Sequence, residues 1–254
     1  MGKSGERYVT RFFPDTGRSY DRVVAWTTLG FDARWKRRLL DLVPPSRAIL
    51  DLACGTGIVT FALLDRFPAA RVVGVDVTED YLAVARAKHQ ARGGDVVWLQ
   101  GDAVTAAVGQ WGPYDAIVSS YLPKYVDADR LLDNVLPALR PGGAIVLHDF
   151  TQPAAALPRL FWRAWYALLE GVAPWRHPEW RNAFDGSLRR LVAETRWVGT
   201  FQMALRRRGY TEVRVSRLTF GSAAIVTARK PLPSQPERGG TPGHPGVPAG
   251  PETP

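Results

Sequence analysis

The sequence predicts an α/β fold with a doubly wound, mostly parallel sheet of seven strands, an antiparallel C-terminal hairpin and a helical, aromatic insertion. Residues 48–150 alternate short apolar runs with stretches of helical pattern, which is typical of βαβ units with right-handed crossovers. The apolar runs are continuous, as expected for strands buried on both faces. Two later runs are separated by only a few residues, which indicates a hairpin.

Each apolar run is expected to form one strand. The first five strands are AILDLA (48–53), RVVGVD (71–76), DVVWLQ (95–100), YDAIVSS (114–120) and GGAIVLHDF (142–150). Helical patterns cover Ile58–Phe67, Tyr81–Gln90, Ala128–Leu139 and Gly199–Arg208. The closing strands are EVRVSRL (212–218) and SAAIVTARK (222–230), joined by the short segment TFG.

Composition divides the chain of 254 residues into one domain and a tail. Residues 1–230 are predicted to form the domain, and the aromatic, helical insertion occupies about residues 154–197. Residues 231–254 consist mainly of Pro, Gly and polar residues, so they cannot bury enough surface to offset the entropy of ordering and are predicted to be disordered. A single cysteine, the absence of an apolar leader and the absence of a membrane-length run favour a cytoplasmic protein.

The basic charge is concentrated in one segment. Residues 151–230 hold 14 Lys and Arg against 5 Asp and Glu, whereas residues 1–150 hold 18 against 17. Such a segment could attract the phosphates of nucleic acid, of an anionic membrane or of an acidic substrate. It could equally be a solvated, arginine-rich surface, and the sequence leaves this choice open.

A glycine-rich loop, CGTG (54–57), follows the first predicted strand. Ligands of an open α/β sheet bind beyond the carboxyl ends of the strands. Polar residues stand at these ends in order along the chain: Asp76 after the second strand, Asp102 after the third and Ser119 in the fourth. Asp76 is suited to accept the two hydroxyls of a ribose, and Asp102 an adenine amino hydrogen.

Two nucleotide ligands compete for this loop. A dinucleotide site prefers a third glycine three residues after the second, and that position is Thr60. Asp51, just before the loop, suits a positively charged amino group better than a pyrophosphate. The ordered set of acids therefore points to S-adenosylmethionine, whose amino-acid end carries an ammonium group.

The segment Ile49–Phe150 resembles the class I S-adenosylmethionine-dependent methyltransferases, through LDLACGTG (50–57), GVD (74–76), GDA (101–103) and LRPGG (139–143). The resemblance implies a Rossmann-like fold and S-adenosyl-L-methionine as cofactor. Carried over residue by residue, it implies cofactor contacts from Tyr20, Asp51, Ala53, Gly55, Gly57, Asp76, Val77, Asp102, Ala103 and Ser119.

A narrower resemblance is to the ubiquinone/menaquinone biosynthesis C-methyltransferases. It rests on YDRVVAWTTLGFDARWKRRLL (20–40), HDFTQP (148–153) and LTFGSAAIVTARK (218–230). This family typically has F-G-L-R-N after the fourth strand, where the chain reads YLPKY (121–125). Lys124 and Tyr125 therefore replace an arginine and an asparagine.

The resemblance implies methyl transfer to a small aromatic or quinone-like acceptor, at carbon or oxygen, by a base-assisted in-line displacement without a metal. Asp149, His148 and Tyr121 are the catalytic candidates, and strand alternation predicts that only one of His148 and Asp149 faces the pocket. Candidates for holding the acceptor are Lys124, Tyr125, Trp162, Tyr166 and His177.

The aromatic segment Leu157–Leu169 has three open interpretations: a lid over an apolar acceptor pocket, a packed core helix, or a surface helix that contacts an anionic membrane. Three rival functions also stay open: a bound S-adenosylmethionine used for a reaction other than methylation, a nucleic-acid methyltransferase, and a binding protein that retains the site. The segment SSYLP (119–123) replaces the N/D-P-P-Y-like loop of base-amino methyltransferases, so we expect no specific nucleic-acid partner. The sequence does not predict the oligomeric state.

Overall fold

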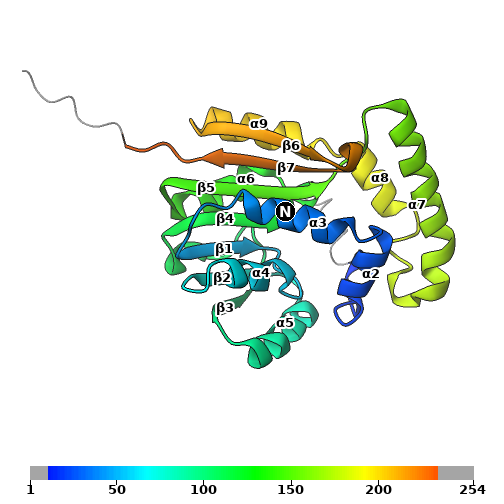
Figure 1. Cartoon of the computed structure of the whole chain (residues 1–254), viewed down its shortest axis with the longest axis horizontal. Coiled ribbons are helices and arrows are strands. Elements are labelled where there is room, and N and C mark those ends of the chain that lie inside the picture. The colour runs from blue at the N-terminus through cyan, green and yellow to red at the C-terminus, as the bar shows by residue number, and fades with distance from the viewer. Residues whose placement is uncertain (1–10, 234–254) are drawn as a thin grey trace, which may run out of the picture.

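A computed structural model describes residues 11–233 of the chain, so most of the predicted tail, residues 234–254, lies outside the described residues. Its centre is a sheet of seven strands in the order β3-β2-β1-β4-β5-β7-β6 (Figure 1). The strands are β1 Ala48–Leu52, β2 Arg71–Asp76, β3 Asp95–Gln100, β4 Tyr114–Ser120, β5 Leu139–Phe150, β6 Thr211–Leu218 and β7 Ala223–Arg229.

The pairing explains where a ligand site can form. Strands β1 to β5 are mutually parallel, and β7 is antiparallel to both β5 and β6. The strand order reverses between β1 and β4, which in α/β sheets opens a crevice at the carboxyl ends of these strands. The predicted mostly parallel sheet with an antiparallel C-terminal pair is confirmed.

Helices cover both faces of the sheet, because each strand exposes apolar side chains on both sides. On one face, α3 (Phe31–Asp41) and α4 (Ile58–Arg66) bury Leu39 and Leu63 against Ile49 and Val118. On the other face, α6 (Ala128–Val135) and α9 (Trp197–Arg207) enclose a second cluster around Leu50. Helix α5 (Glu79–Arg92) packs against β2 and β3.

Three boundaries differ from the sequence prediction by three residues or more. Helix α6 ends at Val135, and a 3-10 turn, η3 (Leu136–Ala138), follows because Pro137 lacks the N–H that would continue the helix. Strand β5 begins earlier, at Leu139, with a bulge before Ala144. Helix α7 (Ala156–Arg176) runs past Gly171 and Pro174, and its last turns are anchored by the fully buried Ala173.

A cap of helices stands beyond the carboxyl ends of the strands (Figure 1). It consists of α2 (Tyr20–Thr27), α7, η4 (Pro178–Trp180) and α8 (Ser187–Glu194). The indole of Trp165 on α7 donates a hydrogen bond to the carbonyl of Thr27 at 2.8 Å, and the indole of Trp180 donates to the hydroxyl of Ser19 at 3.0 Å. The chain before α2 thereby joins the insertion, which the sequence places far away.

Candidate functional site

Two adjoining cavities lie between the sheet and the cap. The first, here called the loop cavity, is lined by the segments that follow β1, β2, β3 and β4. The second, the aromatic cavity, has a volume of about 480 Å³ and is enclosed mainly by aromatic and aliphatic side chains of the cap. Four residues line both cavities and therefore mark their junction: Phe13, Tyr20, Tyr121 and Tyr125.

Asp76 organises the loop cavity. One carboxylate oxygen accepts the backbone N–H of Gly55 at 2.8 Å, and the other accepts the N–H of Thr78 at 2.9 Å. Burial raises the pKa of Asp76, although these N–H donors oppose the shift. Gly55 has φ of 55°, in the left-handed region where a side chain is disfavoured. The second glycine, Gly57, does not line the loop cavity; its φ of 83° is also left-handed, and a Cβ there would come within 2.6 Å of the Phe61 ring.

Asp51 lies behind this loop rather than in the cavity wall. Its Oδ2 atom accepts a hydrogen bond from the hydroxyl of Thr60 at 2.6 Å. Its Oδ1 atom is buried and has no hydrogen-bond partner within the part of the chain that the structure describes. Burial raises the pKa of Asp51 to about 7. Thr60, at the position of a third glycine, therefore helps to position the carboxylate of Asp51.

The other predicted cofactor residues divide into two groups. Ala53, Val77, Asp102 and Ala103 line the loop cavity. Ser119 does not, because its side chain is fully buried and donates a hydrogen bond to the carbonyl of Leu52 at 2.8 Å. The next residue on β4, Ser120, lines the cavity in its place.

The chain before α2 covers the loop cavity. The hydroxyls of Thr16 and Tyr81 are 2.7 Å apart, and the N–H of Gly17 donates to a carboxylate oxygen of Asp80 at 2.8 Å. Tyr20 follows, with its ring centre 5.0 Å from that of Tyr81. Burial raises the pKa of Tyr20 well above its ordinary value, so its hydroxyl stays protonated. This placement agrees with a tyrosine that closes over the cofactor, although the contact itself remains a prediction.

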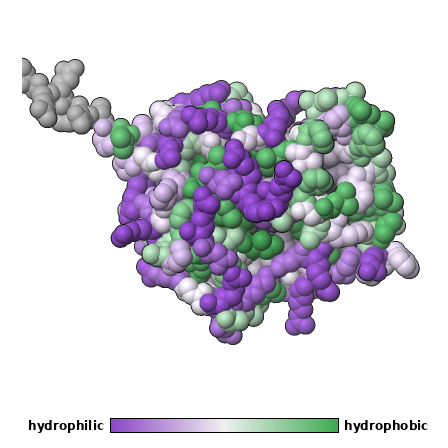
Figure 2. Space-filling view, in the orientation of Figure 1, coloured by the Kyte–Doolittle hydropathy of each residue, from purple (hydrophilic) through white to green (hydrophobic). Residues whose placement is uncertain are grey.

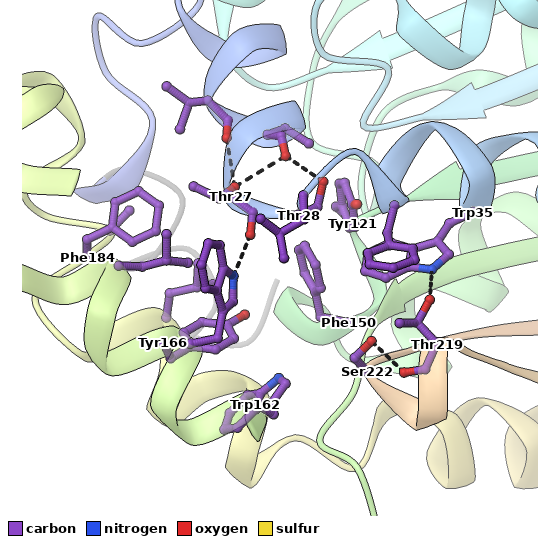
Figure 3. A pocket seen from close by; sticks show the side chains of 18 of the residues that line it. Thr27, Thr28, Trp35, Tyr121, Phe150, Trp162, Tyr166, Phe184, Thr219 and Ser222 are labelled. Carbon is purple, nitrogen blue, oxygen red and sulfur yellow. Dashed lines mark hydrogen bonds between the residues drawn. The ribbon is translucent and has the colours of Figure 1, made fainter. Parts of the chain in front are cut away.

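The aromatic cavity has facing walls (Figure 3). Trp162 and Tyr166 from α7 and Phe184 form one side, and Trp35, Tyr121 and Phe150 form the other. The rings of Tyr121 and Phe150 stack with their centres 4.5 Å apart and only 7° between their planes. Such walls suit a flat, apolar ring, because aromatic pairs stabilise each other when stacked or edge-on.

A buried ion pair lies beside the junction of the cavities. The ammonium of Lys124, which lines the aromatic cavity, donates to Asp149 Oδ1 at 2.7 Å, and the Lys124 N–H donates to Asp149 Oδ2 at 2.9 Å. Both side chains are almost completely buried. Burial lowers the pKa of Lys124 and raises the pKa of Asp149, so the surroundings favour the neutral form of each group.

Tyr121 is fixed by a second buried pair. Its hydroxyl donates to Asp32 at 2.6 Å, and the ammonium of Lys36 donates to both oxygens of the same carboxylate. The ammonium groups of Lys36 and Lys124 lie 5.1 and 5.4 Å from the ring centre of Tyr121. Burial and the charge of Asp32 raise the pKa of this phenol well above its ordinary value. The neutral hydroxyl of Tyr121 is thus committed to Asp32.

His148 and Asp149 point to opposite sides of β5. The ring of His148 is fully buried, with Nδ1 3.0 Å from the hydroxyl of Ser120 and its centre 5.9 Å from that of Trp35. Burial, together with the charges of Lys36 and Lys124, lowers the pKa of His148 well below its ordinary value. His148 lines neither of the two cavities. Asp149 reaches the aromatic cavity only through Lys124.

His177, the remaining predicted acceptor residue, lies at the end of α7. It lines neither cavity, its ring centre is 5.9 Å from that of Trp26, and its Nδ1 atom is 3.6 Å from a carboxylate oxygen of Glu179. The structure thus brings Lys124, Tyr125, Trp162 and Tyr166 together around one cavity and leaves His177 outside it.

Comparison with known proteins identifies the chemistry of this crevice. Residues 49–143 match the methyltransferase domain family. Over 235 residues the chain is 32% identical to the demethylmenaquinone methyltransferase of Thermus thermophilus, covering 86% of this chain and 100% of that relative. It is also 30% identical to the ubiquinone/menaquinone biosynthesis C-methyltransferase of Dinoroseobacter shibae, covering 86% and 88%. The chain belongs to this family of class I S-adenosylmethionine-dependent methyltransferases.

Solved structures confirm the fold of this methyltransferase. Phosphoethanolamine N-methyltransferase 2 of Haemonchus contortus, in complex with S-adenosylmethionine, has a TM-score of 0.58 at 15% identity and covers 78% of this chain. An O-methyltransferase family protein from Burkholderia thailandensis has a TM-score of 0.58 at 19% identity and covers 90%. The chain spans 53% and 63% of the lengths of these two chains.

S-adenosylmethionine is the cofactor of this methyltransferase, and the loop cavity has the groups that such a molecule requires. Carboxylates of Asp76 and Asp102 follow neighbouring strands, and a carboxylate is the acceptor that ribose hydroxyls and an adenine amino group need. When bound, S-adenosylmethionine supplies an electrophilic methyl group. Within residues 11–233 no helix is long and apolar enough to cross a membrane.

Several residues that line the two cavities of this methyltransferase were not predicted from the sequence. Phe13 and Tyr81 line the loop cavity, and Trp35 and Phe184 line the aromatic cavity. Asp32 and Lys36 are spaced four residues apart on α3, a pattern that was visible as a helical ion pair. The hydrogen bond between Asp32 and Tyr121 joins residues that are 89 positions apart, so no local pattern shows it.

Proposed function

We propose that the protein transfers a methyl group from S-adenosylmethionine to a lipophilic aromatic acceptor, a hydroquinone-like ring held in the aromatic cavity. The observation that carries this proposal is the Lys124–Asp149 pair beside the junction of the two cavities. The relatives' names support a quinone-type acceptor, since they include demethylmenaquinone methyltransferases and a 2-phytyl-1,4-naphtoquinone methyltransferase.

The pair would act as the proton acceptor. Before the reaction the ammonium of Lys124 and the carboxylate of Asp149 together carry no net charge. Lys124 would pass a proton to Asp149 while its amine takes the proton of an acceptor hydroxyl, which leaves an ammonium, a neutral carboxyl and one positive charge. Their shifted pKa values keep this change within reach, because burial penalises the charged form of each group. The resulting phenolate makes its oxygen and its ortho carbon nucleophilic.

The methyl group then passes in line from sulfur to the nucleophile. In C-methylation the new C–C bond forms as the C–S bond breaks, and the ring carbon then loses its hydrogen as a proton, which returns to the ring oxygen as aromaticity is restored. The stacked rings of Tyr121 and Phe150 would position the acceptor plane, and the apolar walls would keep water away from the reacting atoms. We do not propose His148 as the base, because it lines neither cavity and its buried ring resists protonation.

The test measures methylation of a demethylated quinol by mass spectrometry. We expect Asp149→Asn and Lys124→Met to lower kcat by about 10²–10⁴-fold, the range typical of a lost proton acceptor. Asp133→Asn is the matched control, because Asp133 also forms an ion pair but lies on the exposed surface of α6. Calorimetry with S-adenosylmethionine shows whether the variants retain the cofactor site.

Each result has a definite meaning. Unchanged kcat in both variants would refute the pair as proton acceptor. A native protein that binds S-adenosylmethionine but methylates no quinol would refute the acceptor class and favour a reaction other than methylation or a different substrate.

A further inference from the structure

The mouth of the aromatic cavity carries large apolar side chains that are exposed to solvent. Five large apolar residues line the cavity and are also exposed to solvent. They come from the α2–α3 corner, from the start of α7 and from η5 (Thr219–Gly221). We call them the apolar rim: Leu29, Phe31, Leu157, Phe161 and Phe220. A cluster of this kind is unusual on a soluble surface and marks an interaction site.

Two rim residues are held in a strained backbone. Leu29 has φ of 53° and Phe220 has φ of 56°, in the left-handed region that large L-residues avoid. They are 62% and 84% exposed, so their side chains gain little from packing inside the protein. Glycine would relieve the strain and remove the exposed apolar surface. Retaining a large apolar residue at both positions indicates that these side chains meet a partner.

Helix α7 extends the rim along its outer side. Its inner side packs through Trp162, Tyr166, Leu169 and Ala173. Its outer side carries an apolar stripe with spacings of four and three residues, about 27 Å long at 1.5 Å per residue. The stripe consists of Leu157, Phe161, Ala164, Leu168, Gly171 and Trp175, with Leu160 beside it. Figure 2 shows the corresponding hydrophobic surface over α7 at the right-hand edge of the molecule.

Exposed arginines lie close in sequence to rim residues, on α3, α7 and β6. Arg34 lies three residues after Phe31, Arg163 two residues after Phe161, and Arg217 three residues before Phe220; all three are exposed. Within residues 11–233, no carboxylate lies within 4.0 Å of any of these guanidinium groups. No described carboxylate neutralises these charges, so they can attract anions outside the protein.

We infer that the apolar rim and the outer stripe of α7 dock the protein onto the surface of an anionic lipid bilayer. An apolar surface with exposed arginines nearby in the sequence, which no described carboxylate pairs, matches the boundary between acyl chains and phosphate headgroups. The choice of a bilayer over another partner rests on the proposed function, because a lipophilic acceptor dissolves in the bilayer and would enter the cavity through the rim. The regular spacing of the stripe would also suit packing against a second copy of this chain, so the test must distinguish bilayer binding from dimer formation.

The experiment compares the native chain with the triple variant Leu160→Ser, Leu168→Ser and Trp175→Ser. These residues belong to the exposed outer side of α7 and do not line the aromatic cavity. Binding is measured by co-sedimentation with vesicles of phosphatidylcholine and phosphatidylglycerol, without substrate. Met203→Ser is the matched control, because Met203 is 56% exposed on α9, away from the rim.

We expect the triple variant to bind these vesicles at least about tenfold more weakly, since each buried apolar side chain adds to the affinity for the bilayer. Native binding should weaken with salt and with vesicles of phosphatidylcholine alone, because the arginine contribution is screened or lost. The variant should keep its affinity for S-adenosylmethionine and its rate with a water-soluble quinol that lacks a lipid tail.

Equal vesicle binding by native chain and triple variant, or no binding by the native chain, would overturn the inference. A native dimer in solution that the triple variant dissociates, without vesicle binding, would also overturn it and assign the stripe to a second copy. Loss of vesicle binding in the variant would support bilayer docking by this surface, even if the protein methylates no quinol. Failure of the docking proposal and failure of the proposed function are therefore distinguishable.

Discussion

Three buried aspartates near the carboxyl ends of the strands differ in the partners of their carboxylates. Among the described residues, Asp149 accepts from the ammonium of Lys124 and from two backbone N–H groups, Asp76 accepts from two backbone N–H groups, and Asp51 accepts only from the hydroxyl of Thr60. Burial raises the pKa of all three. The same residue type thus offers the proposed proton acceptor, a rigid hydrogen-bond acceptor and a group whose charge changes near neutral pH.

The charge of Asp51 makes stability depend on pH. Its folded pKa of about 7 lies above the unfolded value near 3.9. Between these values the folded chain keeps a proton that the unfolded chain has lost, so the free energy of unfolding falls as pH rises. In the ligand-free native chain, we expect Asp51 to lower the free energy of unfolding by on the order of 3 kcal/mol between pH 5 and pH 8. We expect this decrease to be absent in Asp51→Asn.

Urea unfolding at several pH values measures this difference. Asp41→Asn is the control, because Asp41 is an exposed residue at the end of α3. Parallel stability profiles for the native chain and Asp51→Asn would show that Asp51 ionises in the folded protein as it does in the unfolded chain.

Asp76 should control cofactor affinity. We expect Asp76→Ala to raise the Kd for S-adenosylmethionine by about tenfold or more, since a charge-assisted hydrogen bond contributes roughly 1.5–3 kcal/mol. Calorimetry measures the effect, and Asp95→Ala at the opposite end of the sheet is the control. An unchanged Kd for Asp76→Ala would refute the assignment of ribose to this acid.

Local sequence accounts for the residues of the loop cavity better than for those of the aromatic cavity. The ends of parallel strands meet at one edge of the sheet, so the positions of Gly55, Asp76 and Asp102 could be predicted from strand order. Ser119 and Ser120 show the limit, because the sequence does not reveal which of two adjacent serines faces the crevice. Only the hydrogen bond of Ser119 to Leu52 decides it.

At the scale of elements, the short chain before α2 links the sheet to the cap. Thr16 and Gly17 contact Tyr81 and Asp80 on α5, and Ser19 contacts Glu179 and Trp180 in the cap. The sequence could not predict this arrangement, because each contact joins residues that are more than sixty positions apart. The strands were predictable because their apolar runs carry the information locally.

Gly17 is the tightest point of this link. A Cβ at Gly17 would lie 2.8 Å from Asp80 Oδ2 and 3.0 Å from the backbone oxygen of Asp80, so the segment would have to shift. Tyr20, three residues later, lines both cavities. We therefore expect Gly17→Ala to weaken S-adenosylmethionine binding by roughly 3–10-fold, equivalent to about 1 kcal/mol.

Calorimetry again provides the measurement. Gly109→Ala is the matched control, because a Cβ at Gly109 has no neighbour within 4 Å and its backbone is not left-handed. Equal affinity in the native chain and Gly17→Ala would show that the segment before α2 does not shape the cofactor site.

At the scale of the whole molecule, the basic segment 151–230 is partly neutralised by pairing. Arg207 bonds Asp129, and Arg208 bonds both Asp129 and Asp133, which lie on α6. The sequence showed the excess of charge but not these pairs, since the acids of α6 belong to a different segment. The exposed arginines close in sequence to the apolar rim, which no described carboxylate pairs, are therefore more informative than the net charge.

The two apolar clusters share one sheet, which predicts that they unfold together. Ile49 and Leu50 are adjacent on β1, fully buried, and belong to the clusters on opposite faces. Replacing either by Ala leaves a cavity, and we expect each variant to lose about 2–5 kcal/mol of stability. Because β1 is central and pairs with β2 and β4, loss of packing on either face should weaken the whole sheet.

Urea unfolding followed by circular dichroism and tryptophan fluorescence should give coincident, single transitions in both variants. Separate transitions in Ile49→Ala, with the α6 and α9 side unfolding later than the α3 and α4 side, would show that the two faces are independent units.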